Sequence, residues 1–540
     1  SHQVMIERGY VTPGRIVVAS DSHSNIYGAL GALGTPVVRT DAASIWAIGE
    51  TWWQVPKQAR VWLRGKPQLG VVGKDVIIAL CGLFNNDEVL NHAIEFAGDG
   101  VAYLSMEDRM TISNMTTEWG ALAGVFPFDE TLRGWLTDRA EWLQVRRTPR
   151  YTPEDVQKWW KNKYVTDDDA VFNIELELDL ATVIPHVAGP DHVKVMRTLP
   201  EIEQEQMKIN KAYLLSCTNA RIEDLVAASE VVDGKQIADG VDFYVAAASE
   251  TIQEQAEQLG AWQKLEAAGA TFLPPGCGTC IGLGEGTLED GEIGISATNR
   301  NFKGRMGSRD AKAYLASPAV VAASAVNGYI SSPTKYDDVE PSGKVISKAE
   351  PKTSAGSTEI IEGFPQQVTG RVLWLPMDNM NTDGIYSGEM TYKDDVTEQE
   401  MGDAAMCNYD PEFKDISKEG DIVVSGLNFG TGSSREQAAT CLKVRGIPCV
   451  IAASFSETYK RNAINNGFLV IDCPSFVKHL RENLGDNELT VVGGEITIDF
   501  TTATIKSGES EFAFAPLGPV PQEVIVAGGA EAVVAQKLKV

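Results

Sequence analysis

The chain has 540 residues, which is too long for one hydrophobic core and predicts three or four domains. Hydrophobic residues make up 43% and charged residues 22% of it, as in ordinary globular proteins, and no apolar run approaches the length that spans a bilayer. The formal net charge of −27 argues against a nucleic-acid-binding surface, which is basic, but not against an anionic substrate, because a few arginines can override the global field.

Two polar side chains follow the first expected strand. A helical run ends near Gly9, residues 15–19 read as a buried strand, and Asp21 and His23 come directly after it. Polar residues just past the carboxyl end of a strand lie where α/β proteins place ligands. With only six histidines in the chain, His23 beside Asp21 is a candidate catalytic pair, and the alternative is an ordinary surface loop. A capped helix is expected to start at Thr40.

The next region, from about residue 57, contains an amide and a carboxylate at helical spacing. A strand over 59–63 and a helix over 74–84 are expected first. Asn114 and Glu118 then stand at i, i+4 on a helical segment, which brings their side chains together. Four tryptophans on polar helical stretches are interpreted as half-buried covers rather than a cofactor site: Trp135, Trp142, Trp159 and Trp160.

Three cysteines lie at strand ends in a third region. Cys217 follows a strand over 211–216, and Cys277 and Cys280 form a C-x-x-C pair after a strand over 271–273. Three thiolates without an obvious fourth suit an iron–sulfur cluster with one open iron, which acts as a Lewis acid. Half of a zinc site, and a pair with neither role, stay open as alternatives. The remaining cysteines are interpreted as small buried hydrophobes: Cys81, Cys407, Cys441, Cys449 and Cys473.

Two arginines follow in a polar loop of the same region. An amphipathic helix is expected over 221–232, with Thr218 or Asn219 as its N-cap. Farther along, Arg300 and Arg305 lie within six residues of each other. Two guanidinium groups in one loop suit a polycarboxylate, and the alternative is a solvated loop.

Residues 332–367 are rich in Ser, Pro, Lys, Glu and Gly and show little periodicity, which predicts an exposed linker. Strands are expected beyond it over 371–375 and 421–425. Strands and helices alternate along the whole chain, so the predicted fold class is α/β.

A glycine turn opens the helix that follows the last of these strands. Ser433 and Glu436 have the spacing of a capping box. The turn Gly430-x-Gly432 also exposes backbone N–H groups at a helix N-terminus, which binds anions, and Ser434 and Arg435 would point into that site. The same turn can both cap the helix and bind an anion.

Five motifs in order resemble the aconitase superfamily. They are DSH at Asp21, SCTN around Cys217, GCGTC around Cys277, NRNFKGR from Asn299 and GTGSSRE from Gly430. Two further segments, GTPVVRTDAASIWAIGETWWQVP and ISNMTTEWGAL, look most like the fungal homoaconitases, hydro-lyases of the α-aminoadipate route to lysine. The resemblance covers the whole chain.

This resemblance implies reversible hydration of cis-homoaconitate to homoisocitrate, with a tricarboxylic hydroxy-acid as substrate. Aconitate hydratase and 3-isopropylmalate dehydratase are sister alternatives, and the alternatives from other classes are a cluster-free RNA-binding relative and a structural zinc protein. It also implies mitochondrial residence, although no targeting segment is visible in the chain. A monomer without nucleic-acid or membrane partners is expected.

The implied fold is aconitase-like, with three α/β domains around the cluster and a swivelling fourth α/β domain. The first domain is expected to be truncated at its N-terminus. The predicted boundaries are 1–56 for the remainder of domain 1, 57–172 for domain 2, 173–331 for domain 3 with the cluster cysteines, 332–367 for the linker and 368–540 for domain 4.

The resemblance also implies roles for single residues. Cys217, Cys277 and Cys280 would bind a [4Fe–4S] cluster. Ser434, activated by Arg435, would remove a proton from carbon, which requires preorganised donors and cations for the resulting charge. Two pairs, Asp21–His23 and His2–Glu118, would handle protons at the departing hydroxyl. The remaining implied substrate contacts are Ser22, Asn114, Arg300, Arg305, Asp383 and Ser433.

The sequence departs from the family pattern at two places. A further Asp-His pair and a glutamine that precede the match to His2 are not found, so the chain is expected to be incomplete or inactive as it stands. No arginine follows Thr382-Asp383 at the matching distance, and Lys393 is a weak substitute for it. One methylene is worth only about 1–3 kcal/mol of discrimination, so citrate against homocitrate stays open at this level.

Overall fold

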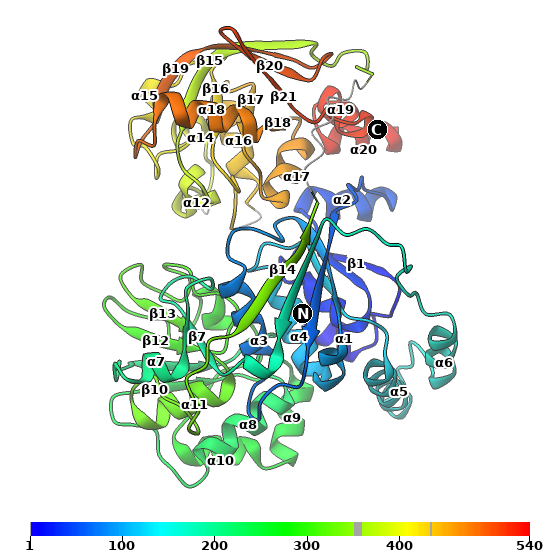
Figure 1. Cartoon of the computed structure of the whole chain (residues 1–540), viewed down its shortest axis with the longest axis vertical. Coiled ribbons are helices and arrows are strands. Elements are labelled where there is room, and N and C mark those ends of the chain that lie inside the picture. Colours follow the sequence, from blue (N-terminus) through cyan, green and yellow to red (C-terminus); the bar gives the residue numbers. More distant parts are fainter. Residues whose placement is uncertain (1, 350–358, 392, 433–434, 540) are drawn as a thin grey trace. The chain divides into compact units, whose positions relative to one another are not determined.

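The computed structural model describes residues 2–349, 359–391, 393–432 and 435–539. Contacts divide the chain into two compact units (Figure 1). The N-terminal unit comprises residues 1–18, 23–35 and 56–349, and the C-terminal unit comprises residues 19–22, 36–55 and 350–540. The predicted division into four domains remains a prediction.

A five-stranded sheet forms one part of the N-terminal unit. Its order is β14-β6-β3-β4-β5, and β6, β3, β4 and β5 run parallel. Alternation along β3 places Ala59, Val61 and Leu63 in the core with 0% exposure. The bounds are β3 Lys57–Arg64, β4 His92–Ala97, β5 Ala123–Val125, β6 Ile174–Asp179, β14 Ser342–Lys348, α3 Gly73–Leu83, η2 Asp99–Tyr103, α4 Met106–Met115 and η3 Leu180–Thr182.

Strand β14 lies inside the segment predicted to be a linker. It pairs antiparallel with β6 as an edge strand, and all seven of its residues are exposed (Figure 1). The strand is exposed, as predicted for this segment, but it is regular structure; residues 350–358 of the segment lie outside the described residues, and Phe364 is buried. The polar composition of β14 lacks the alternation that marks a half-buried strand, since neither of its faces is covered.

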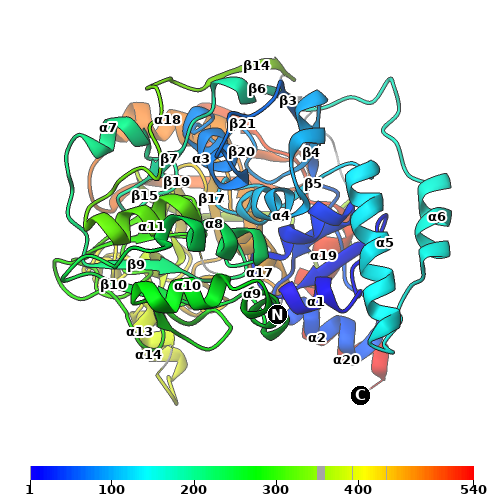
Figure 2. The same cartoon turned by 90° about the horizontal axis from the view of Figure 1, so that it is seen from below.

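A seven-stranded sheet forms a second part of the N-terminal unit. Its order is β11-β10-β9-β12-β13-β7-β8, and the first five strands run parallel. Helix α8 packs against α10 and α11 beside this sheet (Figure 2). The bounds are β7 His186–Ala188, β8 Met196–Thr198, β9 Lys211–Leu214, β10 Asp242–Val245, β11 Thr271–Phe272, β12 Ile293–Ser296, β13 Lys312–Leu315, α7 Leu199–Glu203, α8 Ile222–Val232, α9 Glu250–Gln258, α10 Ala261–Ala268, η4 Gly278–Ile281 and α11 Pro318–Asn327.

The remaining elements of this unit include the helices that carry the four tryptophans. Trp135 and Trp142 lie on α5, Trp159 and Trp160 lie on α6, and all four are partly buried against one hydrophobic cluster, as predicted. The bounds are α1 His2–Glu7, β1 Ile16–Ala19, η1 Ser24–Leu30, β2 Leu33–Pro36, α5 Glu130–Val145 and α6 Pro153–Lys161.

The C-terminal unit is built on another seven-stranded sheet, in the order β18-β17-β16-β15-β19-β20-β21. Strands β15 to β18 run parallel and the other three antiparallel. The bounds are β15 Gln367–Leu375, β16 Ile422–Ser425, β17 Cys449–Ala452, β18 Leu469–Asp472, β19 Val491–Asp499, β20 Thr504–Ser507, β21 Ser510–Ala513, α2 Arg39–Ile48, α12 Thr382–Ile385, α13 Gly388–Thr391, α14 Glu398–Asp403, α15 Phe413–Ile416, α16 Gln437–Val444, α17 Glu457–Asn465, α18 Pro474–Leu484, α19 Pro519–Val526 and α20 Ala530–Leu538.

Parallel strands connected by helices in both units confirm the α/β prediction. Within the described residues, none of the helices has both the length and the apolar composition that crossing a bilayer requires.

Candidate active site

The three predicted thiols lie in loops that follow two strands of the N-terminal unit. Cys217 follows β9, and Cys277 and Cys280 follow β11, with β10 between these two strands. None of the three forms a disulfide among the described residues; Cys217 and Cys277 are half-buried, and Cys280 is 4% exposed. Because β9, β10 and β11 run parallel, their carboxyl ends bring the cysteine loops to the same edge of the sheet.

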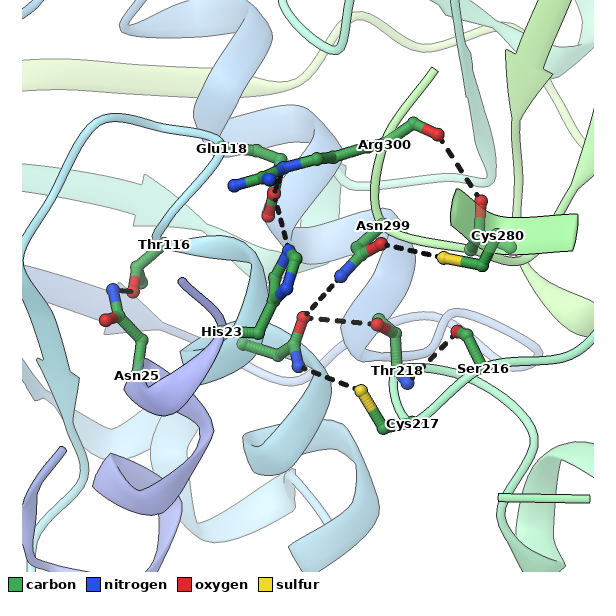
Figure 3. Close-up of polar contacts among 12 residues, drawn as sticks. His23, Asn25, Thr116, Glu118, Ser216, Cys217, Thr218, Cys280, Asn299 and Arg300 are labelled. Atoms are coloured by element: carbon green, nitrogen blue, oxygen red, sulfur yellow. Dashed lines mark hydrogen bonds and ion pairs between the residues drawn. The ribbon is translucent and has the colours of Figure 1, made fainter. Parts of the chain in front are cut away.

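Two asparagines link the two cysteine loops. Asn114 Nδ2 donates a hydrogen bond to Cys217 Sγ at 3.8 Å, and Cys280 Sγ donates one to Asn299 Oδ1 at 3.4 Å (Figure 3). Asn299 Nδ2 completes the chain by donating to Asn114 Oδ1 at 3.3 Å. Both asparagines are buried, so this bridge is shielded from water.

The Cys217 loop is also bound by a buried arginine. Arg221 Nη1 donates to the Cys217 carbonyl at 2.5 Å, and Nη2 donates to Thr111 Oγ1 at 2.6 Å. Arg221 is the N-cap residue of α8, so the prediction of Thr218 or Asn219 as the cap is wrong. The Asn219 amide donates instead to Thr111 and to Asp224, because the loop packs on α4 rather than folding over its own helix.

A buried lysine that the sequence did not indicate joins two loops of the site. Lys74 Nζ donates to Asn219 Oδ1 at 3.3 Å and to the carbonyls of Ala297 and Thr298 at 3.0 and 2.5 Å. Its side chain has no exposed surface, and this burial lowers the pKa of Lys74 to about 7. A lysine near the start of a helix normally faces solvent, so no sequence signal pointed to it.

Glu118 is the focus of the charged part of the site. Its Oε1 contacts His23 Nε2 at 2.9 Å and Arg300 Nε at 2.6 Å (Figure 3). Burial raises the pKa of Glu118, but the charges of His23 and Arg300 outweigh burial and hold that pKa below its ordinary value. Its Oε2 is buried and has no hydrogen-bond partner among the described residues.

The two loop arginines are not solvated, so that alternative is wrong. The Arg300 side chain is 14% exposed, and its Nε binds Glu118. Arg305 lies beside Cys280, and burial together with the charge of Arg300 lowers the pKa of Arg305. Burial raises the pKa of Cys280 to about 11, against the opposing effect of Arg305. Arg305 Nε is buried without a hydrogen-bond partner in the described part of the chain, so it is a donor available to an anion.

The geometry around Glu118 differs from the predicted pairing. The imidazole that hydrogen-bonds to Glu118 is that of His23, whereas His2 Nδ1 hydrogen-bonds to the Tyr27 hydroxyl at 2.8 Å. Helix α4 ends at Met115, so Asn114 and Glu118 do not share a helical face, and Glu118 lies in the turn that follows. The turn directs the carboxylate to His23 and leaves Asn114 to the cysteine loops.

Other predicted residues belong to the C-terminal unit. Asp21 and Ser22 group with it, whereas His23 groups with the N-terminal unit. Ser433 and Ser434 lie outside the described residues. Asp383 accepts hydrogen bonds from Gly388 N at 2.9 Å and from Asn408 Nδ2 at 3.4 Å.

Arg435 is held by the loop that contains Asp383. Its Nη1 donates to the Thr382 carbonyl at 3.3 Å, to Asp383 Oδ1 at 3.4 Å and to the Tyr386 carbonyl. The glycine turn before it has the predicted geometry, since Gly430 and Gly432 have φ of 78° and 101°. A Cβ at Gly430 would lie 2.2 Å from the Tyr459 ring, so only glycine fits there.

The donor set fits an iron–sulfur cluster. Three thiols come from two loops, Asn114 and Asn299 hydrogen-bond to two of the sulfurs, and Arg305 places a cation beside Cys280. No three His, Cys, Asp or Glu side chains of the described residues gather closely enough to hold a single ion. A cluster distributes its thiolates over several irons, so it does not require them to meet at one point.

Comparison with known proteins gives family matches over most of the chain. A model described as "Aconitase family (aconitate hydratase)" matches residues 1–328, and a model of the "Aconitase C-terminal domain" matches residues 344–475. The mitochondrial homoaconitase of Debaryomyces hansenii is 50% identical over 557 residues, which cover 100% of this chain and 81% of that protein. That of Yarrowia lipolytica is 51% identical over 556 residues, which cover 98% and 81%.

A solved structure matches a smaller part. It is a 3-isopropylmalate dehydratase from Methanocaldococcus jannaschii, 30% identical, and the match covers 32% of this chain and 96% of that chain with a TM-score of 0.28.

Proposed function

The chain belongs to the aconitase family, and from this premise we propose that it is a hydro-lyase that reversibly hydrates cis-homoaconitate to homoisocitrate. Relatives named homoaconitase share about half of their residues with it over its whole length, and their names place them in mitochondria. By this resemblance the chain is a mitochondrial enzyme of lysine biosynthesis. The observation that carries the proposal is the buried Glu118 carboxylate, which has His23 and Arg300 on one oxygen and an unpartnered second oxygen.

An iron–sulfur cluster comes with the family, and we propose a [4Fe–4S] cluster held by Cys217, Cys277 and Cys280. When bound, it supplies a Lewis-acidic iron that can take a carboxylate and the hydroxyl of a hydroxy-acid. The amide of Asn114 supports this assignment, because it donates to Cys217 Sγ and such a hydrogen bond stabilises a thiolate.

Glu118 is proposed to move the proton of the added water. Its lowered pKa keeps the carboxylate ionised at neutral pH, so in the hydration direction it can accept a proton from the attacking water. In dehydration the same oxygen returns the proton to the departing hydroxyl. His23 and Arg300 fix Oε1, and this orients Oε2 for the transfer.

The substrate carboxylates are proposed to bind Arg300 and Arg305. The buried Nε of Arg305 supports this, because a guanidinium nitrogen without a partner is costly unless a ligand occupies it. The proton on carbon is proposed to be taken by Ser434 with the help of Arg435, which the 382–386 loop holds in place.

The substrate preference is tested by rates. The anaerobically reconstituted protein is supplied with cis-homoaconitate, cis-aconitate and 2-isopropylmaleate, and kcat/KM is measured for each. We expect the highest value for cis-homoaconitate. A higher value for either of the other acids would contradict the homoaconitase assignment, and the acid with the higher value would identify the sister activity.

The catalytic assignment is tested by substitution. Ser434→Ala should retain the brown cluster and lose turnover, whereas Cys280→Ser should lose both. A Ser434→Ala variant with near-normal rates would show that another group is the base.

A further inference from the structure

A short segment from the first part of the chain is built into the C-terminal unit. Residues 36–55 group with this unit, although the chain around them belongs to the N-terminal one. Helix α2 packs against α17 and against α20, beside which it lies in Figures 1 and 2. Residues far apart in sequence therefore share one core here.

Asp41 anchors this segment. Its carboxylate is 1% exposed and accepts bonds from both donor sides of Arg461, from Asn465 Nδ2 at 2.8 Å and from Thr51 Oγ1 at 2.9 Å. Arg461 also donates to the Trp52 carbonyl at 2.5 Å and lies 4.3 Å from the centre of the Trp52 ring. The segment is therefore bound by a dense buried network.

The residue before this anchor contacts Glu436, the neighbour of Arg435 in sequence. Thr40 is 6% exposed, and its Oγ1 donates to Glu436 Oε1 at 2.5 Å. The same carboxylate oxygen accepts a bond from Asn466 Nδ2 at 2.9 Å. Asp41 fixes the helix that carries Thr40, so the hydroxyl is presented to Glu436 from a rigid support.

Glu436 directly follows Arg435, the residue whose guanidinium is held by the loop over 382–386. This pair of residues is consequently fastened on two sides. The loop holds Arg435, and Thr40 with Asn466 holds Glu436. If the Thr40 contact is lost, Glu436 keeps Asn466 on the same oxygen and Arg39 Nη2 at 3.6 Å from its Oε2, but it loses the shorter of its two contacts with the 36–55 segment.

We propose that Thr40 is a positioning residue that sets the place of Arg435 through Glu436. The inference rests on the proposed function, in which Arg435 assists the base. A hydrogen bond from a hydroxyl to a carboxylate is short and directional, which suits it to fixing a backbone position. Misplacing a reacting group by about 1 Å can cost about 10²-fold in rate, so a single hydroxyl can have a measurable effect.

The chain offers a matched set of variants. Thr40→Val removes the hydroxyl at nearly constant volume, and Thr40→Ser keeps it. Thr51→Val is the control, because it removes a hydroxyl of the same segment that donates to Asp41 and does not contact Glu436. Two readouts are used in the full-length protein: kcat and KM of the reconstituted enzyme, and amide hydrogen exchange over residues 435–444 of the protein without substrate.

We expect Thr40→Val to lower kcat roughly 10- to 100-fold, to change KM less, and to speed exchange over 435–444. Thr40→Ser should restore both values, and Thr51→Val should alter neither, even if both valine variants lower the melting temperature. The wild-type rate is measured first and decides the proposed function by itself. If the wild type hydrates none of the three acids, the proposed function fails and Thr40 is still judged by exchange. Equal exchange in Thr40→Val and Thr51→Val, or an unchanged kcat in Thr40→Val, would overturn the inference.

Discussion

Replacing Asp41 by asparagine tests the energetic weight of the segment 36–55. The substitution keeps the shape of the side chain and removes its charge, so Arg461 is left as a buried cation without its counter-charge. The two side chains are 1% and 7% exposed, so little water can replace the lost partner. Removing one member of a buried ion pair typically costs about 3–5 kcal/mol.

This cost translates into a shift of the melting temperature. For a unit of about 200 residues, 1 kcal/mol lowers Tm by about 2–4 °C, so Asp41→Asn should lower the transition of the C-terminal unit by about 6–20 °C. The assay is differential scanning calorimetry of the full-length protein, with hydrogen exchange to assign the transition to this unit.

The control is Glu50→Gln. Glu50 joins the same segment to α20 through Lys537 at 2.7 Å, but both side chains are more than half exposed, so its Tm should stay within experimental error of the wild type. The double variant Asp41→Asn, Arg461→Gln should lose less stability than the sum of the losses in the two single variants, because the double variant has no uncompensated buried cation. The reasoning would be refuted if Asp41→Asn shifted Tm no more than Glu50→Gln does.

Three further predictions concern the N-terminal unit. Glu118→Gln should keep the visible absorption of the cluster and lower kcat by about 10²–10⁴-fold, the range of general acid–base catalysis, and steady-state rates at equal iron content check it. Lys74→Met should leave the Asn219 amide and two carbonyls without their donor, so alkylation of Cys217 in the cluster-free protein should speed up relative to the wild type; unchanged labelling would contradict the loop-holding role of Lys74. Burial lowers the pKa of His186 from 6.5 to about 4, and its ring nitrogens have no hydrogen-bond partner among the described residues. As the pH falls from 6.5 to 4, His186 binds a proton in the unfolded chain but not yet in the folded one. The free energy of unfolding therefore decreases by about 3 kcal/mol over that window. His186→Phe should flatten the dependence of unfolding free energy on pH by that amount, measured by denaturant titration at several pH values.

Local pattern was enough to predict several elements and the chemistry of the thiols. Strands β9 and β16 follow from short, mostly apolar runs, helix α8 from apolar spacing and the turn at Gly430 from glycine, all of which act over a few residues. Three cysteines at strand ends, with two arginines in one loop, pointed to a thiolate-bound cofactor and an anionic substrate before any element was placed in space.

Partners across long stretches of sequence could not be predicted in this way. Glu118 contacts His23 across 95 residues and Arg300 across 182, and Thr40 contacts Glu436 across 396. Nothing near these residues in sequence encodes which elements will meet, because the choice is made by the packing of whole sheets and helices. The fully buried Lys74 shows the same limit, since its acceptors come from two distant loops.

The sequence by itself determined the α/β class, the cysteine set and the arginine loop, because residue type and short spacing are sufficient for each of them. Only the tertiary structure decided that His23 is paired with Glu118, that one carboxylate oxygen stays open, and that residues 36–55 complete the C-terminal unit. These features depend on burial, which arises when segments distant in sequence pack together and exclude water. A buried charge then needs a partner that is near it in space, and that partner is often far away along the chain.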